Sequence, residues 1–303
     1  MTVLYDAPGP RAKRLSLAIS MIGGLVIVAG LAALVVFLAL PRTNAGGVET
    51  PGMLAPERWD IVLDRAMWRA VIGRGLVGTL QMAAVAAVLA VVIGILLSIV
   101  RTAKLAIVRV PAIIVIEFFR GMPVLLLMLF ILLVFSSGAY IAGVAALALY
   151  NGAVIGEALR AGVAALPRGQ RESGLALGLT PLRTRFLIEF PQAFRQMLPI
   201  IIAQLVVLLK DTSLAYIIGY QELLDVGIRQ GPTTFGSKYL FTLFFIVLAL
   251  YLAVNLLFST LARIVAKRTA GGRRRPSRRT AAVLAQLGGA GVDGGGAGVS
   301  GGP

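Results

Sequence analysis

Long runs of apolar residues dominate the chain, separated by short segments rich in arginine, proline and glycine. A helix that crosses a bilayer needs about 20 mostly apolar residues. Six segments meet this requirement, and each predicts a membrane-spanning helix: 15–40, 76–100, 112–135, 139–159, 196–218 and 239–262. The pattern therefore predicts an all-α, polytopic membrane protein with about six transmembrane helices.

The first apolar run fits two interpretations. A signal peptide also begins with basic residues, here Arg11, Lys13 and Arg14. Its apolar core is only about 7–15 residues long, however, and a cleavage site follows. Because the run 15–40 is much longer, we expect a retained transmembrane helix.

Composition supports a lipid-facing surface. Only 14% of the residues are charged and 58% are hydrophobic, whereas soluble domains carry about 25% charged residues. The chain has no cysteine and no histidine. This excludes disulfides and thiol chemistry, and it leaves only oxygen ligands, so we expect no metal site.

The formal net charge of +16 raises the possibility of a nucleic-acid partner. If the basic segment 1–14 is cytoplasmic, however, most of the 29 lysines and arginines fall in cytoplasmic loops. That is the usual bias of membrane proteins. We therefore expect both termini in the cytoplasm and anionic lipid headgroups, not nucleic acid, as the partner of this charge.

Two segments lie outside the predicted core. Residues 41–75 are expected outside the cytoplasm, where the amphipathic stretch 59–65 fits a short surface helix with Trp59 and Trp68 at the interface. Residues 266–303 form a basic, Gly-rich segment that cannot bury enough apolar surface to fold. We predict a disordered cytoplasmic tail there.

The longest internal cytoplasmic segment is 160–195. Prolines and glycines divide it: Pro167, Gly169, Gly178, Pro181 and Pro191. Helices are predicted at 168–177 and 182–190, which would form a hairpin against the membrane. Three leucines surround the central glycine: Leu175, Leu177 and Leu179. They fit either a partner's groove or the chain's own helices.

The same segment carries a recognisable pattern. Permeases of binding-protein-dependent ABC importers have a cytoplasmic signature written E-A-A-x3-G-x9-I-x-L-P. The sequence resembles it without a gap, with the fixed residues at Glu172, Gly178, Ile188 and Pro191. The departures are small-for-small or apolar-for-apolar: Ser173, Gly174 and Phe190.

The resemblance extends over residues 73–265 and points to the polar-amino-acid branch of these permeases. Segments similar to that branch are Gly75-Leu76 with Thr79-Leu80, 117–123, 157–162 with 166–170, and 210–214. The N-terminal helix and the basic tail look most like glutamate-uptake permeases.

The resemblance implies a type I ABC importer permease core of five helices within 76–265, plus the extra N-terminal helix 15–40. It also implies partners: a dimer of ATP-binding subunits, a second permease chain that is identical or a sister, an external amino-acid-binding protein, and the bilayer of the cytoplasmic membrane. The chain has no G-x4-G-K-[S/T] loop. We therefore expect no catalytic residue and no cofactor here, with ATP and Mg on the partner ATPase.

The resemblance assigns coupling to the ATPase to the hairpin. The residues expected to act there are Glu172, Leu175, Ala176, Leu177, Gly178, Leu179, Thr180, Ile188 and Pro191. ATP binding would pull two such hairpins together and rock the spans between outward-open and inward-open states.

Two predicted spans contain ionisable residues, which at membrane depth usually face protein or water. Glu117 and Arg120 lie three apart and fit either a gate or a structural ion pair. The run 210–213, namely Lys210, Asp211, Thr212 and Ser213, fits either the substrate pathway or a broken helix.

Three rival functions remain at this point. A permease of the same architecture could carry another amino acid or an osmolyte. A secondary transporter or channel usually needs intramembrane carboxylates or histidines, which are scarce here. A membrane scaffold would leave the hairpin unexplained.

Overall fold

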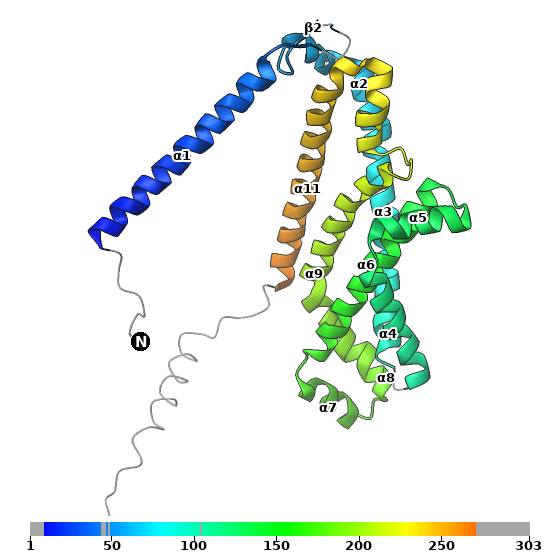
Figure 1. Ribbon diagram of the computed structural model, residues 1–303. Coiled ribbons are helices and arrows are strands. Elements are labelled where there is room, and N and C mark those ends of the chain that lie inside the picture. The colour runs from blue at the N-terminus through cyan, green and yellow to red at the C-terminus, as the bar shows by residue number, and fades with distance from the viewer. Residues whose placement is uncertain (1–8, 44–46, 48, 104, 271–303) are drawn as a thin grey trace, which may run out of the picture. The chain divides into compact units, whose positions relative to one another are not determined.

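The computed structural model describes residues 9–43, 47, 49–103 and 105–270, and this part of the chain is almost wholly helical (Figure 1). The longer helices are α1 (Pro10–Ala39), α3 (Val77–Arg101), α4 (Ala106–Gly121), α5 (Val124–Phe135), α6 (Ala139–Ala164), α9 (Phe190–Asp211) and α11 (Leu240–Ala270). The shorter α-helices are α2 (Arg65–Ala70), α7 (Arg168–Ala176), α8 (Pro181–Thr184) and α10 (Gly231–Phe235).

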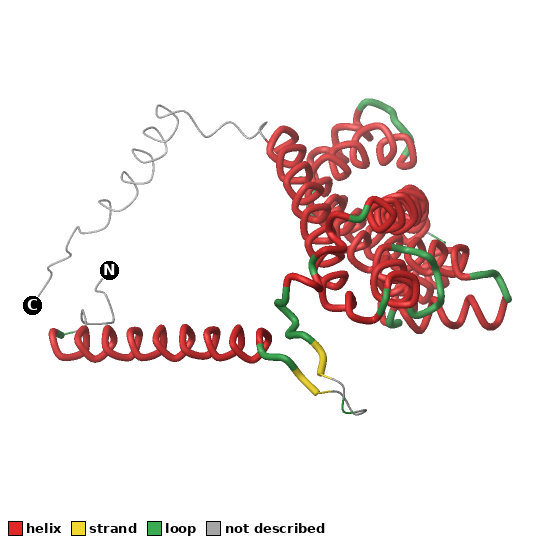
Figure 2. The backbone as a smooth tube through the Cα atoms, turned by 90° about the horizontal axis from the view of Figure 1, so that it is seen from above, coloured by secondary structure: helices red, strands yellow, loops and turns green. Residues whose placement is uncertain are grey.

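Irregular helical turns and two short strands connect them. The 3-10 turns are η1 (Pro56–Arg58), η2 (Asp60–Leu63), η5 (Thr212–Tyr216) and η7 (Ser237–Tyr239). The π turns are η3 (Val71–Leu76), η4 (Arg185–Glu189) and η6 (Asp225–Gln230). The strands β1 (Arg42–Thr43) and β2 (Glu49–Thr50) pair antiparallel, with Arg42 opposite Thr50 (Figure 2).

Five continuous helical segments are long and apolar enough to cross a membrane: Pro10–Ala39, Arg65–Arg101, Ala139–Ala164, Pro181–Tyr216 and Ser237–Val265. A sixth is counted only if α4 and α5, which are bent by 106°, form one broken span. The fold therefore agrees with the predicted all-α membrane class and with five to six spans.

The segment predicted as one span at 112–135 is divided into α4 and α5. Met122 is extended, with ψ 130°, and α5 begins directly after Pro123. A proline disfavours helical geometry in the residue before it, so Pro123 ends α4 and starts α5. Pro123 alone thus predicts a bend in this span, but not its angle of 106°.

The predicted break at Pro191 is wrong, because α8, η4, α9 and η5 form one helical segment from Pro181 to Tyr216. Pro191 has no N–H to bond the carbonyl four residues earlier. The π turn η4 lies immediately before it, and there the Phe190 N–H bonds the Arg185 carbonyl instead. This wider turn accommodates the proline, so the helix continues through it.

The predicted tail begins too early. Helix α11 continues to Ala270 and thus includes the first five residues of the segment 266–303. Residues 271–303 lie outside the described residues, as do residues 1–8.

Contacts divide the chain into two units, Met1–Met82 with Thr212–Leu252 and Ala83–Asp211 with Ala253–Pro303. The first has an apolar cluster built from Ile61, Met67, Val71, Leu223, Leu243, Ile246 and Val247. None of the residues of α1 is buried. Because α1 is apolar on all sides, its surface suits contact with lipid.

In the second unit, α6 is central and packs against α4, α5 and α9. It also approaches α3 closely. A Cβ at Gly152 would lie 2.8 Å from the Ile93 Cγ2, and one at Gly94 would lie 2.7 Å from the Ile155 Cγ2. Only glycine permits this separation of the two helices.

Candidate coupling site and charged network

The predicted hairpin consists of α7, a tight turn, and α8 continuing into η4. Gly178, at the turn, has φ +79°, a conformation that side chains rarely adopt. Its N–H donates to the Leu175 carbonyl at 3.0 Å, and the Leu179 N–H donates to the Gly174 carbonyl at 3.2 Å. These two bonds form a Schellman motif, which ends α7 at the glycine.

The next residues begin the second arm. The Thr180 hydroxyl accepts a hydrogen bond from the Arg183 N–H at 3.3 Å and so caps α8. Pro181 occupies the first helical turn, where its missing N–H costs nothing. The local sequence therefore fixes both arms of the hairpin.

The two arms pack at Gly174, which is buried. A Cβ built there would lie 2.6 Å from the Thr184 Cγ2 and 2.9 Å from the Ile188 Cδ1. The glycine thus lets α7 approach α8 and η4 more closely than the second alanine of the E-A-A signature would. Ile188, which was expected to couple to the ATPase, lies partly buried on this inner side.

The outer end of the hairpin, residues 175–180, is named here the tip. Leu177 is 79% exposed and Leu175 is 40% exposed. Ala176, Gly178 and Thr180 are also exposed, and Leu179 is partly buried. Of the other predicted coupling residues, Glu172 is exposed on α7 and Pro191 is exposed on α9. The predicted hairpin thus presents apolar side chains away from its own helices.

A second group of predicted residues belongs to a chain of ion pairs. Glu117 pairs with Arg120 at 3.5 Å, as the spacing predicts, and also with Arg101 at 3.2 Å. Arg101 in turn pairs with Glu157 at 2.9 Å, and Glu157 pairs with Arg160 at 2.7 Å. These five residues, named here the ion-pair network, join α3, α4 and α6.

Arg101 is the centre of the network, and its side chain is only 14% exposed. The sequence did not predict this role, because the two acidic partners of Arg101 are distant from it along the chain. The pair Glu117–Arg120 is more exposed, at 53% and 38%. The arrangement favours the structural interpretation of that pair over a gate.

The run 210–213 lies where α9 changes into the 3-10 turn η5. Thr212 is fully buried, Lys210 is exposed, and Asp211 and Ser213 are partly buried. The helix thus changes its type within the predicted run.

An acidic centre in the other unit was missed. Glu222 is fully buried and accepts hydrogen bonds from the Asp225 N–H at 2.8 Å and from the hydroxyl of Tyr251. Burial raises the pKa of the Glu222 carboxyl. Asp225 pairs with the Arg229 Nε at 2.5 Å. Only the Glu-x-x-Asp spacing signals this centre in the sequence.

Metal ligands are a separate question. Within residues 9–43, 47, 49–103 and 105–270, no group of three or more acidic, cysteine or histidine residues is placed to hold a metal ion.

Comparison with known proteins gives the hairpin and the helices a context. Residues 90–271 match the family described as "Binding-protein-dependent transport system inner membrane component". The chain belongs to this family. Its members are permease subunits of ABC transporters, in which a partner subunit hydrolyses ATP, and this permease is accordingly a multi-pass membrane protein.

Individual relatives agree with the family. This permease is 37% identical over 232 residues to the "Glutamate transport system permease protein GluD" of Corynebacterium glutamicum, covering 74% of this chain and 84% of that one. It is 33% identical over 195 residues to the "Probable glutamine ABC transporter permease protein GlnP" of Bacillus subtilis, covering 62% and 89%.

Solved structures support the fold. The "Crystal structure of an amino acid ABC transporter with histidines" matches this permease with a TM-score of 0.59 and 30% identity, covering 66% of this chain and 94% of that one. An inward-facing MetNI methionine ABC transporter matches with a TM-score of 0.54 at 18% identity, covering 67% and 99%. The type I ABC permease fold expected from the sequence is thereby confirmed.

Proposed function

We propose that this permease imports a polar amino acid, with glutamate as its substrate, across the cytoplasmic membrane. The observation that carries the proposal is the 37% identity, over 74% of this chain, to a glutamate permease. The resemblance of 117–123 and 210–214 to the polar-amino-acid branch supports the same substrate class.

The tip couples the import of the amino acid to ATP hydrolysis by a partner ATPase. Leu177 and Leu175 are exposed on a hairpin whose shape is fixed by the Gly178 turn and the Thr180 cap. Burying exposed leucines in a partner's groove contributes about 1.5–3 kcal/mol for each fully buried side chain. Glu172, on the outer face of α7, contributes a polar contact at the rim of this interface. ATP and Mg are held by the ATPase dimer.

The remaining partners follow from the family and the charge distribution. An external binding protein delivers the amino acid, and a second permease chain completes the pathway. Both termini lie in the cytoplasm, since most basic residues are then on that side. Residues 41–75 then lie outside the cytoplasm, and residues 76–265 form the permease domain.

Within the membrane, we assign the substrate pathway to the run 210–213, where the helix type changes. Such interrupted helices free backbone groups that can contact a substrate. The pair Glu117–Arg120 instead serves the ion-pair network.

Reconstitution tests the substrate assignment. The complete transporter, with its ATPase, second permease and binding protein, would be placed in liposomes and supplied with labelled amino acids. We expect ATP-dependent uptake of glutamate at least about tenfold faster than that of glutamine or arginine. Faster uptake of glutamine or arginine would overturn glutamate as the substrate but keep the class. Uptake that continues without ATP would overturn the importer itself.

A further inference from the structure

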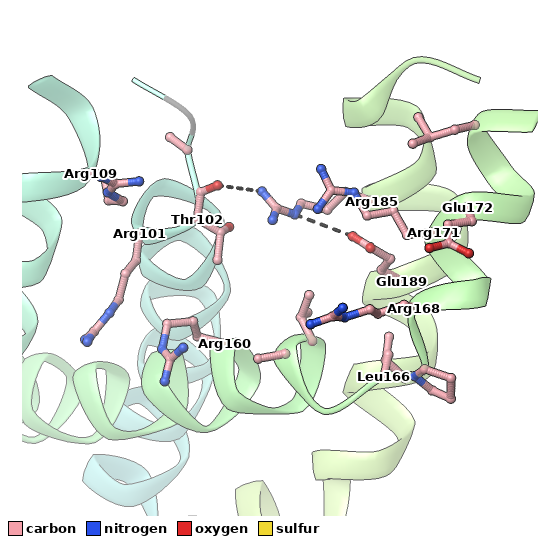
Figure 3. A pocket seen from close by; sticks show the side chains of 15 residues that line it. Arg101, Thr102, Arg109, Arg160, Leu166, Arg168, Arg171, Glu172, Arg185 and Glu189 are labelled. Atoms are coloured by element: carbon pink, nitrogen blue, oxygen red, sulfur yellow. Dashed lines mark hydrogen bonds and ion pairs between the residues drawn. The ribbon is translucent and has the colours of Figure 1, made fainter. Parts of the chain in front are cut away.

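An arginine-lined cavity lies beside the hairpin, in the unit built around α6. Its volume is about 670 Å³. The loop after α3 and the start of α4 form one wall, the end of α6 forms the floor, and α7 with η4 forms the other wall (Figure 3). Six arginines from these elements line it: Arg101, Arg109, Arg160, Arg168, Arg171 and Arg185.

The cavity is short of negative charge. Arg101 and Arg160 both pair with Glu157, which is not part of the lining. The other charged residues of the lining are four arginines and two glutamates, Glu172 and Glu189, which leave a formal charge of +2.

Three of those arginines have no partner among the residues that the structure describes. The side chains of Arg109, Arg168 and Arg171 make no hydrogen bond or ion pair there, and all three are exposed. Like charges gathered in one concavity repel each other unless an anion joins them. The guanidinium group is planar and binds phosphate through two parallel N–H donors. The arrangement thus favours a phosphate group.

Arg185 holds the two walls together. Its Nη1 donates to the Thr102 carbonyl at 2.7 Å, and its Nε lies 3.8 Å from a Glu189 carboxylate oxygen (Figure 3). These contacts join the loop after α3 to η4. The cavity wall is therefore a built feature of the fold and not only a group of solvated side chains.

A second cavity adjoins the charged one and has a volume of about 440 Å³. Six of its nine lining residues also line the first cavity, and the three that do not are apolar: Leu105, Pro181 and Leu182. Leu105 and Leu182 are each 67% exposed. Arginines beside an exposed apolar edge match an amphiphile with an anionic head.

We propose that the arginine-lined cavity binds an anionic phospholipid of the cytoplasmic leaflet. The lipid phosphate would lie between Arg109 and the two arginines of α7, Arg168 and Arg171. The choice of the cytoplasmic leaflet depends on the proposed orientation of the chain in the membrane. The contacts that form the cavity do not depend on that orientation. Basic pockets between helices on the cytoplasmic side are suited to such headgroups. The lipid would join α4 to the coupling hairpin, which gives the bilayer a direct contact with the element that meets the ATPase.

Lipid binding to the purified full chain tests the proposal. Labelled phosphatidylglycerol would be titrated into protein held in a zwitterionic detergent. Each arginine near an anionic headgroup contributes about 1 kcal/mol, so the double variant Arg109→Gln/Arg168→Gln should bind at least about tenfold more weakly. The matched double variant Arg183→Gln/Arg195→Gln removes equal charge from exposed arginines outside the cavity, and we expect its affinity within about twofold of wild type.

Two results would overturn the site. Equal losses in both double variants would mean that binding follows net charge, and wild-type affinity in Arg109→Gln/Arg168→Gln would mean that the lipid binds elsewhere. Thermal unfolding of each variant in detergent checks that it is folded. This readout needs no transport, so its failure is distinct from failure of the proposed substrate.

A competition separates a lipid from a soluble phosphate compound. Glycerol 3-phosphate at millimolar concentration should leave the labelled lipid bound, because it cannot fill the apolar side. The variant Leu105→Gln/Leu182→Gln should weaken the lipid several-fold. Complete displacement by glycerol 3-phosphate, with no effect of the leucine variant, would overturn the lipid in favour of a soluble ligand.

Discussion

The tip and the ion-pair network lie in the same unit but are built in opposite ways. The tip is exposed and apolar, and its shape comes from bonds between residues close in sequence, such as the Leu179 N–H to the Gly174 carbonyl. The ion-pair network is charged and centred on a residue that is only 14% exposed, and it joins three helices. One region offers surface to a partner, while the other satisfies the chain's own charges.

This difference separates two kinds of effect. Changes at the tip should reduce transport while leaving the chain folded, since little of the fold contacts Leu177. Changes at the centre of the network should destabilise the chain, because Glu157, whose side chain is 20% exposed, then loses one of its two arginine partners.

The largest effect is expected at the tip. Leu177→Ser removes the most exposed leucine of the hairpin, so ATP-driven uptake in the reconstituted transporter should fall more than tenfold. Leu187→Ser is the matched control, because Leu187 is 67% exposed on η4 and is not part of the tip. Unequal thermal stability of the two variants, or equal uptake by both, would contradict the comparison.

The second effect is expected at Arg101. Arg101→Gln leaves Glu117 and Glu157 with one arginine each, Arg120 and Arg160. We therefore expect a loss of about 2 kcal/mol in stability, below the cost of about 3–5 kcal/mol for breaking a buried pair outright. Arg120→Gln removes a pair that is 38% and 53% exposed, so the loss should stay below about 0.5 kcal/mol. Thermal unfolding of the purified chain compares the two variants. An equal decrease in melting temperature would show that Arg101 is no more important to the network than Arg120.

A third, smaller effect concerns the turn. Gly178→Ala places a Cβ on a residue with φ +79°, which costs about 1 kcal/mol. Because no atom lies within 4 Å of that position, the cost should be conformational, and Gly178→Asn should recover part of it. If alanine and asparagine reduced stability equally, the positive φ would not be the cause.

The smallest effect is expected between the arms. Gly174→Ala restores the alanine of the E-A-A signature but brings its Cβ to 2.6 Å from the Thr184 Cγ2. We expect a loss of about 1 kcal/mol, at the lower end of the cost of overpacking, because the nearest atoms belong to side chains and not to the backbone. The double variant Gly174→Ala/Thr184→Ser removes that methyl group and should restore the melting temperature. No recovery would mean that Ile188 or the backbone sets the spacing.

The contrast also shows what the sequence could reveal. The hairpin and its glycine turn were predictable, since both depend on neighbouring residues. The sequence left open whether the three leucines pack on the chain's own helices, and the structure exposes Leu175 and Leu177. The 106° bend between α4 and α5 was only partly predictable, because Pro123 marks its place but packing sets its angle. The continuous helix through Pro191 was missed, since a π turn leaves no composition signal.

The ion-pair network and the acidic centre at Glu222 depend mostly on residues that are distant in sequence, and these contacts were not predicted. Glu117 and Arg120 were predicted to pair because they lie three apart on a helix. Arg101 meets Glu157 only through the packing of α3 on α6, and Glu222 meets Tyr251 only through the fold of its own unit. Contacts of this kind depend on tertiary structure and could not be read from spacing.

The central claim, that the tip docks into a partner ATPase, can be measured directly because the chain contains no cysteine. Single variants Leu177→Cys and Leu187→Cys would be assembled with the ATPase and treated with a short bifunctional thiol reagent that reacts with cysteines engineered along the ATPase surface. The account predicts a cross-linked product for Leu177→Cys whose yield changes with ATP, and little product for Leu187→Cys. Cross-linking from Leu187→Cys alone, or none from Leu177→Cys in an assembled and active transporter, would contradict it.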